Sequence, residues 1–191
     1  MNKKMVVYCS SSDVLEDSYY DAATEIGALM VSHCYDLVFG GSRVGLMGAL
    51  AKAVHSNDGH ITGVIPEFMR NKGIAYEASD ELVVTQSLRE RKEIMEHRAD
   101  AFVALPGGFG TLEEVMEVLT LRQLQVHSKP IVLLNINGFY DPLIAFFNVL
   151  YDRGFAKKDH RELYFVADSC KSVFDFLASY KPSQKTSKWS G

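Results

Sequence analysis

The chain passes from an apolar run into a helical pattern at Leu105-Pro106-Gly107-Gly108-Phe109-Gly110-Thr111-Leu112-Glu113-Glu114. The run 101–105 is typical of a buried strand. Three glycines within four residues let the backbone approach a ligand closely, and Thr111 can cap the following helix or donate its hydroxyl. The free N–H groups of a helix start, together with the helix dipole, favour an anion such as phosphate. A phosphate-binding turn followed by two carboxylates in the first helical turn suggests an enzyme that acts on a phosphorylated small molecule.

Short β-rich runs alternate with helical patterns on both sides of this turn. We expect strands at 5–10, 37–39, 61–65, 82–85, 101–105, 131–135 and 164–166, and helices near 18–32, 44–57, 88–99, 111–126, 140–152 and 171–180. Near-continuous apolar strands separated by helices indicate an α/β domain whose mostly parallel sheet is covered on both faces. The prediction is a Rossmann-like, doubly wound fold, which binds its ligands at the carboxyl ends of the strands.

Length and composition bound the class of protein. The 191 residues fit one domain, expected over 1–180, and the polar segment 181–191 is expected to be a disordered tail. The net charge of −4 gives no basic footprint for nucleic acid, and no apolar run approaches the roughly 18 residues of a membrane span. Because the first residues run straight into a strand, we expect no secretory signal and a cytoplasmic location.

The cysteines and histidines suggest no cofactor and no metal site. Cys9, Cys34 and Cys170 are scattered and lack CxxC spacing, so we interpret them as reduced thiols that are mostly buried. The six histidines lack the spacing of metal ligands.

A second glycine cluster, Gly40-Gly41-Ser42-Arg43-Val44-Gly45-Leu46-Met47-Gly48, follows the second expected strand. Its spacing is not that of a dinucleotide fingerprint. Ligand contact and pure turn geometry remain equal alternatives for this cluster.

The carboxylates of Glu113 and Glu114 point in directions about 100° apart on a helix. Glu114 lies next to the apolar stripe of Leu112 and Val115, which packs on the sheet. We therefore expect its carboxylate to lie closer than that of Glu113 to the base of the phosphate-binding turn. The alternative is that both carboxylates only compensate the helix dipole. A first-turn position would lower the pKa of Glu114, which disfavours a role as general acid at neutral pH.

The helix at 88–99 places Arg91 within an apolar stripe, where a buried guanidinium needs an anionic partner. Arg91 and Lys92 can clamp a phosphate or meet Glu114 across the pocket. The alternative is a solvated basic helix in which the glutamates at 90, 93 and 96 are the salt-bridge partners.

Over roughly residues 4 to 180 the chain resembles the LOG ("Lonely Guy") family, because Pro106 to Glu114 matches its PGGxGTxxE signature. Further matching pieces are Gly45-Leu46-Met47-Gly48, Arg91-Lys92 ahead of Arg98-Ala99-Asp100-Ala101, Lys129-Pro130 followed by Leu133-Leu134-Asn135, and Asn137-Gly138-Phe139-Tyr140-Asp141. The resemblance implies hydrolysis of the N-glycosidic bond of a nucleoside 5′-monophosphate, with AMP or an N6-substituted cytokinin nucleotide as substrate. It also implies no cofactor and a homodimer whose pockets include residues of both subunits.

Site residues are carried over by this resemblance. Arg91 and Glu114 would form the catalytic pair. The nucleotide would be bound by Lys92, Gly107, Gly108, Phe109, Gly110, Thr111, Leu112, Glu113 and Thr120. Two departures from the family pattern lie near the pocket: Leu88-Arg89 stands for its usual Met-His, and Ser42 for a third glycine.

The chemistry leaves one role unassigned. Departure of the base creates an oxocarbenium-like sugar, which an anionic Glu114 can stabilise or attack while it holds the ribose hydroxyls and a water. Arg91 is a poor proton donor because its pKa lies near 12 or above, so we expect it to hold phosphate or to orient Glu114. Glu77 or Glu81, in the loop before the Arg91 helix, is the candidate donor to the departing base.

Two other functions remain as alternatives. Molybdenum-cofactor carrier proteins share a similar fold and phosphate loop, and would retain a ligand without turnover. A lysine decarboxylase would need a lysine placed to form a Schiff base with pyridoxal phosphate, and no lysine here stands in such a setting.

Overall fold

A computed structural model describes residues 2–182, so that most of the expected tail lies outside the described residues. Within that range the strands form one seven-stranded sheet in the order β4-β3-β2-β1-β5-β6-β7, and every neighbouring pair is parallel. The strands are β1 (Lys3–Tyr8), β2 (Tyr35–Phe39), β3 (Ile61–Pro66), β4 (Glu81–Thr85), β5 (Ala101–Ala104), β6 (Ile131–Leu134) and β7 (Phe165–Ala167). The predicted Rossmann-like α/β fold is confirmed.

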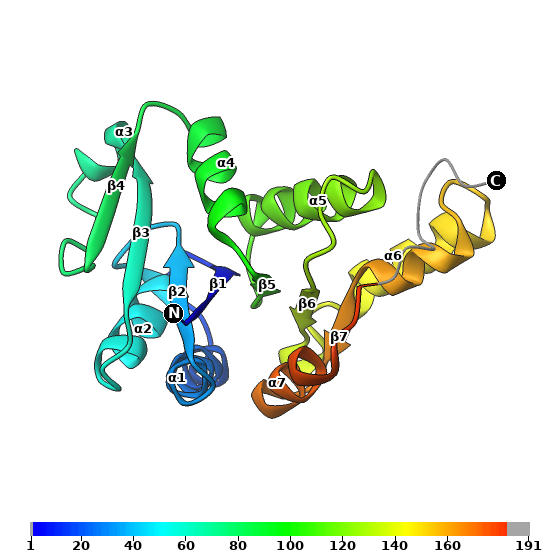
Figure 1. The fold of residues 1–191 in the computed structure, drawn as a ribbon, viewed down its shortest axis with the longest axis horizontal. Helices are drawn as coiled ribbons and strands as arrows, with labels where there is room; N and C mark the ends of the chain where they lie inside the picture. Colours follow the sequence, from blue (N-terminus) through cyan, green and yellow to red (C-terminus); the bar gives the residue numbers. More distant parts are fainter. Residues whose placement is uncertain (1, 183–191) are drawn as a thin grey trace.

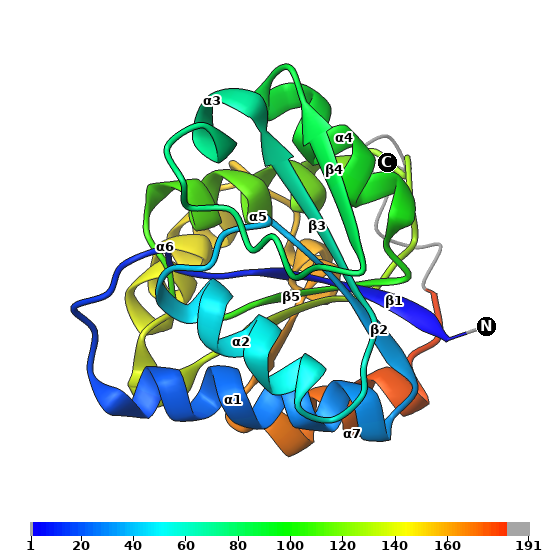
Figure 2. The same ribbon diagram turned by 90° about the vertical axis from the view of Figure 1, so that its left-hand side faces the viewer.

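The helices cover both faces of the sheet, as Figures 1 and 2 show. They are α1 (Asp17–Ser32), α2 (Gly45–His55), α3 (Glu67–Arg70), α4 (Leu88–Arg98), α5 (Phe109–Gln123), α6 (Asp141–Asp152) and α7 (Cys170–Ser179), with 3₁₀ turns η1 (Ile136–Gly138) and η2 (Lys158–Leu163). The short α3 and the two 3₁₀ turns were not predicted, since segments this short show no helical period.

Two apolar cores lie on opposite faces of the sheet, because successive strand residues point to opposite sides. Val7 belongs to the core formed with α1, α2 and α7, whereas Tyr8 belongs to the core formed with α4, α5 and α6. The helices α1, α5, α6 and α7 each bury one side against a core, whereas most residues of α2 are buried and α3 has no buried residue.

The winding reverses between β1 and β5, which lie side by side in the middle of the sheet. From β1 the chain builds one half of the sheet as far as β4, and from β5 it builds the other half. Loops that leave two such strands in opposite directions open a crevice at their carboxyl ends. None of the helices between residues 2 and 182 has the length and apolar character needed to cross a bilayer.

Candidate active site

A cavity of about 620 Å³ opens at the carboxyl ends of the central strands, at this reversal point. Its walls come from the ends of β1 and β2, from α2 and α3, and from the first turns of α4 and α5. The predicted site residues that line it are Arg91, Gly108, Phe109, Gly110, Thr111 and Glu114. The expectation that ligand-binding groups gather at this edge of the sheet is supported by this placement.

Arg91 and Glu114 form an ion pair across the cavity, from α4 to α5. Both side chains are nearly removed from solvent, with 12% of the arginine and 9% of the glutamate side chain exposed. The predicted contact between the two is confirmed. The alternative of a solvated basic helix is wrong for Arg91, because its partner is a buried carboxylate rather than a glutamate of its own helix.

Capping at the start of α4 fixes the position of Arg91 beside the cavity. The Ser87 side chain accepts a hydrogen bond from the Glu90 N–H, and the Glu90 carboxylate accepts one from the Gln86 N–H. These bonds begin α4 at Leu88, so that Arg91 lies one turn into the helix.

The start of α5 differs from the prediction. The helix begins at Phe109, with Gly108 as its N-cap and no side-chain cap, whereas Thr111 is buried inside the first turn. The interpretation of Thr111 as a cap is therefore wrong. No acidic residue lies in the first turn, and Glu114 stands in the second, where the helix dipole acts weakly.

The expected effect on acidity is also wrong. Burial raises the pKa of the Glu114 carboxyl, and this outweighs the nearby Arg91, which acts in the opposite direction. Desolvation prevails because the carboxylate is almost entirely enclosed between the two helices and the end of β1.

Lys92 and Glu113 form a second ion pair beside the first, and Lys92 also contacts Glu117 at 2.8 Å. These residues do not line the cavity, although they join the same two helices. The interpretation of Glu113 as a dipole-compensating residue is wrong, since it lies beyond the first turn and pairs with a lysine.

Gly107, Leu112 and Thr120 stand apart from the cavity. A side chain at Gly107 would overlap the Thr111 side chain, with a Cβ placed 2.6 Å from that of Thr111. Leu112 packs against the core beneath α5. The Thr120 hydroxyl donates to the Met116 carbonyl, and Thr120 lines a separate cavity of about 210 Å³ between α5 and α6.

The candidate proton donors are placed elsewhere. Glu77 accepts two hydrogen bonds from Arg70, and Glu81 accepts two from Arg98. Neither carboxylate lines the cavity, so the structure does not support the prediction that one of them protonates the departing base.

The second glycine cluster, at residues 40–48, combines both alternatives that the sequence left open: ligand contact and turn geometry. Gly40 lines the cavity, and a Cβ there would lie 3.4 Å from the Arg91 guanidinium. Gly41 and Gly45 have positive φ angles of 70° and 59°, which favour glycine in the turn.

Several cavity residues were missed. The serines at 10–12 follow β1, and the rule that ligands lie after strand ends pointed to them. Another part of the cavity wall comes from α3 and the loop that follows it, with Phe68, Met69, Lys72 and Ile74. This wall carried no sequence signal, because it has neither a period nor a motif.

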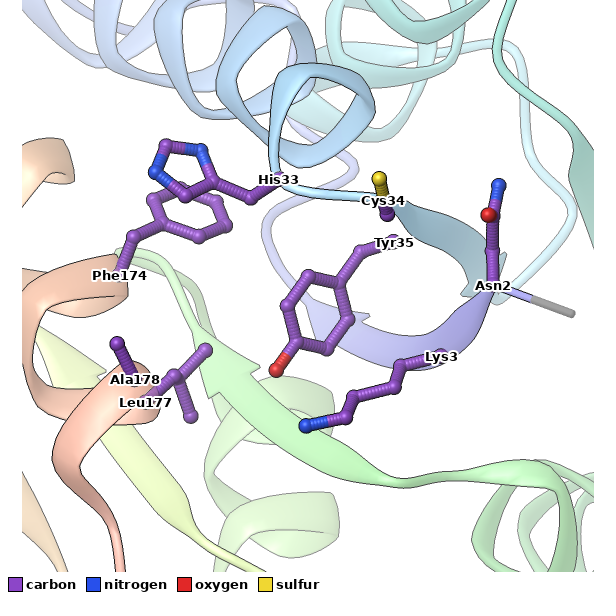
Figure 3. A pocket seen from close by; sticks show the side chains of 8 residues that line it. All are labelled: Asn2, Lys3, His33, Cys34, Tyr35, Phe174, Leu177 and Ala178. Atoms are coloured by element: carbon purple, nitrogen blue, oxygen red, sulfur yellow. The ribbon is translucent and has the colours of Figure 1, made fainter.

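A further cavity, of about 360 Å³, lies at the opposite edge of the sheet, where β1 and β2 begin (Figure 3). The His33 ring lies over Phe174 there, with ring centroids 4.4 Å apart. Among the described residues, no Asp or Glu lines this second cavity. It also lies at the opposite ends of the strands from the Arg91–Glu114 ion pair.

Comparisons with known proteins agree on one family. A family model described as "Possible lysine decarboxylase" matches residues 47–177. A probable cytokinin riboside 5′-monophosphate phosphoribohydrolase of Oryza sativa is 44% identical over 94% of this chain and 79% of its own length. A cytokinin riboside 5′-monophosphate phosphoribohydrolase of Arabidopsis thaliana is 40% identical over the same shares.

Solved structures share the fold. The molybdenum cofactor carrier protein of Chlamydomonas reinhardtii superposes with a TM-score of 0.70 at 26% identity, covering 94% of this chain and all of that one. A molybdenum cofactor binding protein of Rippkaea orientalis gives a TM-score of 0.72 at 22% identity over 94% of this chain and 98% of that one, which shows the fold alone.

Proposed function

This chain belongs to the LOG family of cytokinin riboside 5′-monophosphate phosphoribohydrolases, and we propose that it hydrolyses the N-glycosidic bond of AMP or of an N6-substituted AMP. The products are the free base and ribose 5-phosphate. The buried Arg91–Glu114 pair beside the start of α5 carries the proposal, because it places a carboxylate next to an anion-binding turn.

The phosphate binds at the start of α5. The N–H groups around Gly108, Gly110 and Thr111 are at the cavity wall, and a helix of 15 residues adds its dipole. The ammonium group of Lys72, on the opposite wall, adds positive charge. This anchoring brings the ribose to the floor of the cavity, next to Glu114.

Among residues 2–182, Glu114 is the single acidic residue that lines the cavity. Its carboxylate must therefore carry out the reaction without a second one. In its ionised form it faces the positive charge that develops on the ribose, and it takes a proton from the water that attacks C1′ as the bond to the base breaks. The departing base takes its proton from solvent water, so that the products are the neutral base and ribose 5-phosphate. Arg91 is the cation that contacts Glu114, so it keeps Glu114 oriented and favours the ionised form.

The first test incubates the protein with AMP or with isopentenyladenosine monophosphate and measures the released free base by chromatography. We expect the wild type to release base and Glu114→Gln to lose at least about a hundredfold in kcat, with nucleotide binding retained. The variant keeps the shape of the side chain and removes its charge. Equal rates for the variant and the wild type would contradict the assignment of Glu114.

A carrier without turnover remains the second candidate, favoured by the likeness to the Chlamydomonas carrier protein. It predicts that the wild type binds AMP and releases no base from either nucleotide. The ratio of the two rates, if base is released, identifies the preferred substrate.

The protein also acts, in this proposal, as a cytoplasmic homodimer, with α5 and α6 at the contact. Met116, Phe146, Val149 and Phe155 are exposed along this face, and Thr120 lies among them, so a second copy would cover it. We expect Phe155→Asp, which changes a side chain that is 81% exposed, to give a monomer in sedimentation and to lower turnover. A wild-type monomer that turns over AMP would contradict the dimer.

A further inference from the structure

Tyr8 is the last residue of β1 and lies at the point where the winding of the sheet reverses. It pairs with Ala104 of β5, and its carbonyl accepts a hydrogen bond from the Leu105 N–H at 2.9 Å. The ring stacks on Phe102 with centroids 6.2 Å apart, under α4 and α5. The backbone and the ring of Tyr8 are therefore fixed by the strand and by the core.

The phenol end of Tyr8 lines the cavity together with Arg91 and Glu114. Within residues 2–182 its hydroxyl makes no hydrogen bond, and it is not among the fully buried polar atoms that lack a partner, so it is open to the cavity. Tyr140, the comparable buried tyrosine, donates its hydroxyl to the Leu105 carbonyl at 2.7 Å. The fold gives the Tyr8 hydroxyl no acceptor within residues 2–182, so its position leaves it free to bond a group in the cavity.

A second donor at the same place also lacks an acceptor. The Arg91 Nε is buried and bonds no protein atom of the described residues, while its neighbouring Nη2 binds Glu114. Two donors that lack a protein acceptor thus belong to residues that line the cavity with Glu114, and they match a ligand that offers oxygen acceptors there. A ribose carries such oxygens on its hydroxyls and in its ring.

The charge state of the phenol suits a donor. Burial raises the pKa of Tyr8 well above its ordinary value, and the nearby Glu114 raises it further. The hydroxyl thus keeps its proton at neutral pH.

We propose that the Tyr8 hydroxyl donates a hydrogen bond to a ribose oxygen of the bound nucleotide and so holds the sugar against Glu114. Tyr8 is then a substrate-binding residue on the floor of the site. This inference rests on the proposed function, since it takes a ribose 5-phosphate group as the ligand.

The test is Tyr8→Phe, which removes the hydroxyl and retains the ring that packs on Phe102. We expect kcat/KM for AMP to fall about five- to tenfold and the affinity for ribose 5-phosphate, measured by calorimetry, to fall by a similar factor. The affinity for inorganic phosphate should not change. The melting temperature should not fall, because the hydroxyl bonds nothing within the protein.

Tyr140→Phe is the matched control. It removes a hydroxyl that bonds Leu105 and lies outside the cavity lining, so it should lower the melting temperature without a selective loss of ribose 5-phosphate affinity. Unchanged kcat/KM and unchanged ribose 5-phosphate affinity in Tyr8→Phe would overturn the inference. If the wild type releases no base, the proposed function fails, and the calorimetric comparison of ribose 5-phosphate binding still decides the role of Tyr8.

Discussion

Replacing Arg91 by methionine tests whether the ion pair is required to keep a charge inside the protein. The substitution leaves Glu114, whose side chain is 9% exposed, without its cation. Removing one partner of a buried pair costs about 3–5 kcal/mol. Because the cavity lets water approach this carboxylate, we expect the lower end, about 3 kcal/mol at pH 8. For a chain of this length that corresponds to a fall of roughly 6–12 °C in melting temperature.

The loss must depend on pH in one direction. In the wild type the pKa of Glu114 is already raised by burial and held back by Arg91, so the substitution raises it further. A carboxyl whose pKa is higher in the folded state than in the unfolded state binds more protons when folded, over the interval between the two values. Stability therefore decreases as pH rises through this interval. The difference between variant and wild type should be small near pH 4.5 and largest at pH 8.

The assay is urea unfolding of both proteins at one protein concentration and at several pH values between 4.5 and 8. The control is Lys92→Met, because Lys92 pairs with Glu113 and Glu117, whose side chains are 59% and 40% exposed. Such a pair contributes less than about 1 kcal/mol, so Lys92→Met should lose less stability at pH 8 than Arg91→Met. If Arg91→Met lost the same stability at pH 4.5 as at pH 8, the buried charge would not be the cause, and the reasoning would be refuted.

Three further outcomes are expected. Gly107→Ala should misplace the phosphate-binding turn and weaken AMP binding at least tenfold in calorimetry, because a Cβ there overlaps Thr111. Phe109→Ala should leave the melting temperature unchanged, since the ring is 93% exposed, and should raise KM for isopentenyladenosine monophosphate about fivefold; an unchanged KM would exclude the ring from the substrate site. Asp80 lies half-exposed beside His55 and His60; burial acts to raise the pKa of Asp80, but the Ile61 N–H and the two histidines outweigh it, and the pKa is lowered. Asp80→Asn should therefore cost at most about 1 kcal/mol at pH 6, and in urea unfolding the difference from the wild type should shrink as the pH falls through the lowered pKa of Asp80.

The alternation of apolar runs and helical patterns predicted every strand of the described sheet. This succeeded because strands covered on both faces are apolar throughout, so each of them stands out from the helices around it. The segment Glu67–Arg70 and the loop after it were not predicted, although Phe68, Met69 and Lys72 form a wall of the cavity. A single helical turn is stabilised by contacts with neighbouring elements rather than by its own sequence, so no local sequence pattern predicts it.

The start of α5 shows how a local rule can be overruled. The motif suggested that Thr111 caps the helix, yet the chain enters the helix two residues earlier and buries Thr111 against Gly107. Tertiary packing of the threonine prevailed over its capping preference, and this shift moved the carboxylates out of the first turn.

The sequence by itself determined the fold class. It also predicted that the site lies at the carboxyl edge of the sheet and, through the family resemblance, that Arg91 and Glu114 are its candidate pair. Periodicity and glycine spacing are local properties, and the order of the elements follows from them. Only the tertiary structure decided that these two side chains, 23 residues apart in sequence, meet in a buried contact. It also decided that the pKa of Glu114 is raised and that the Tyr8 hydroxyl faces the same cavity. Desolvation depends on what surrounds a group from all sides, and that information is absent from the residues next to it in the chain.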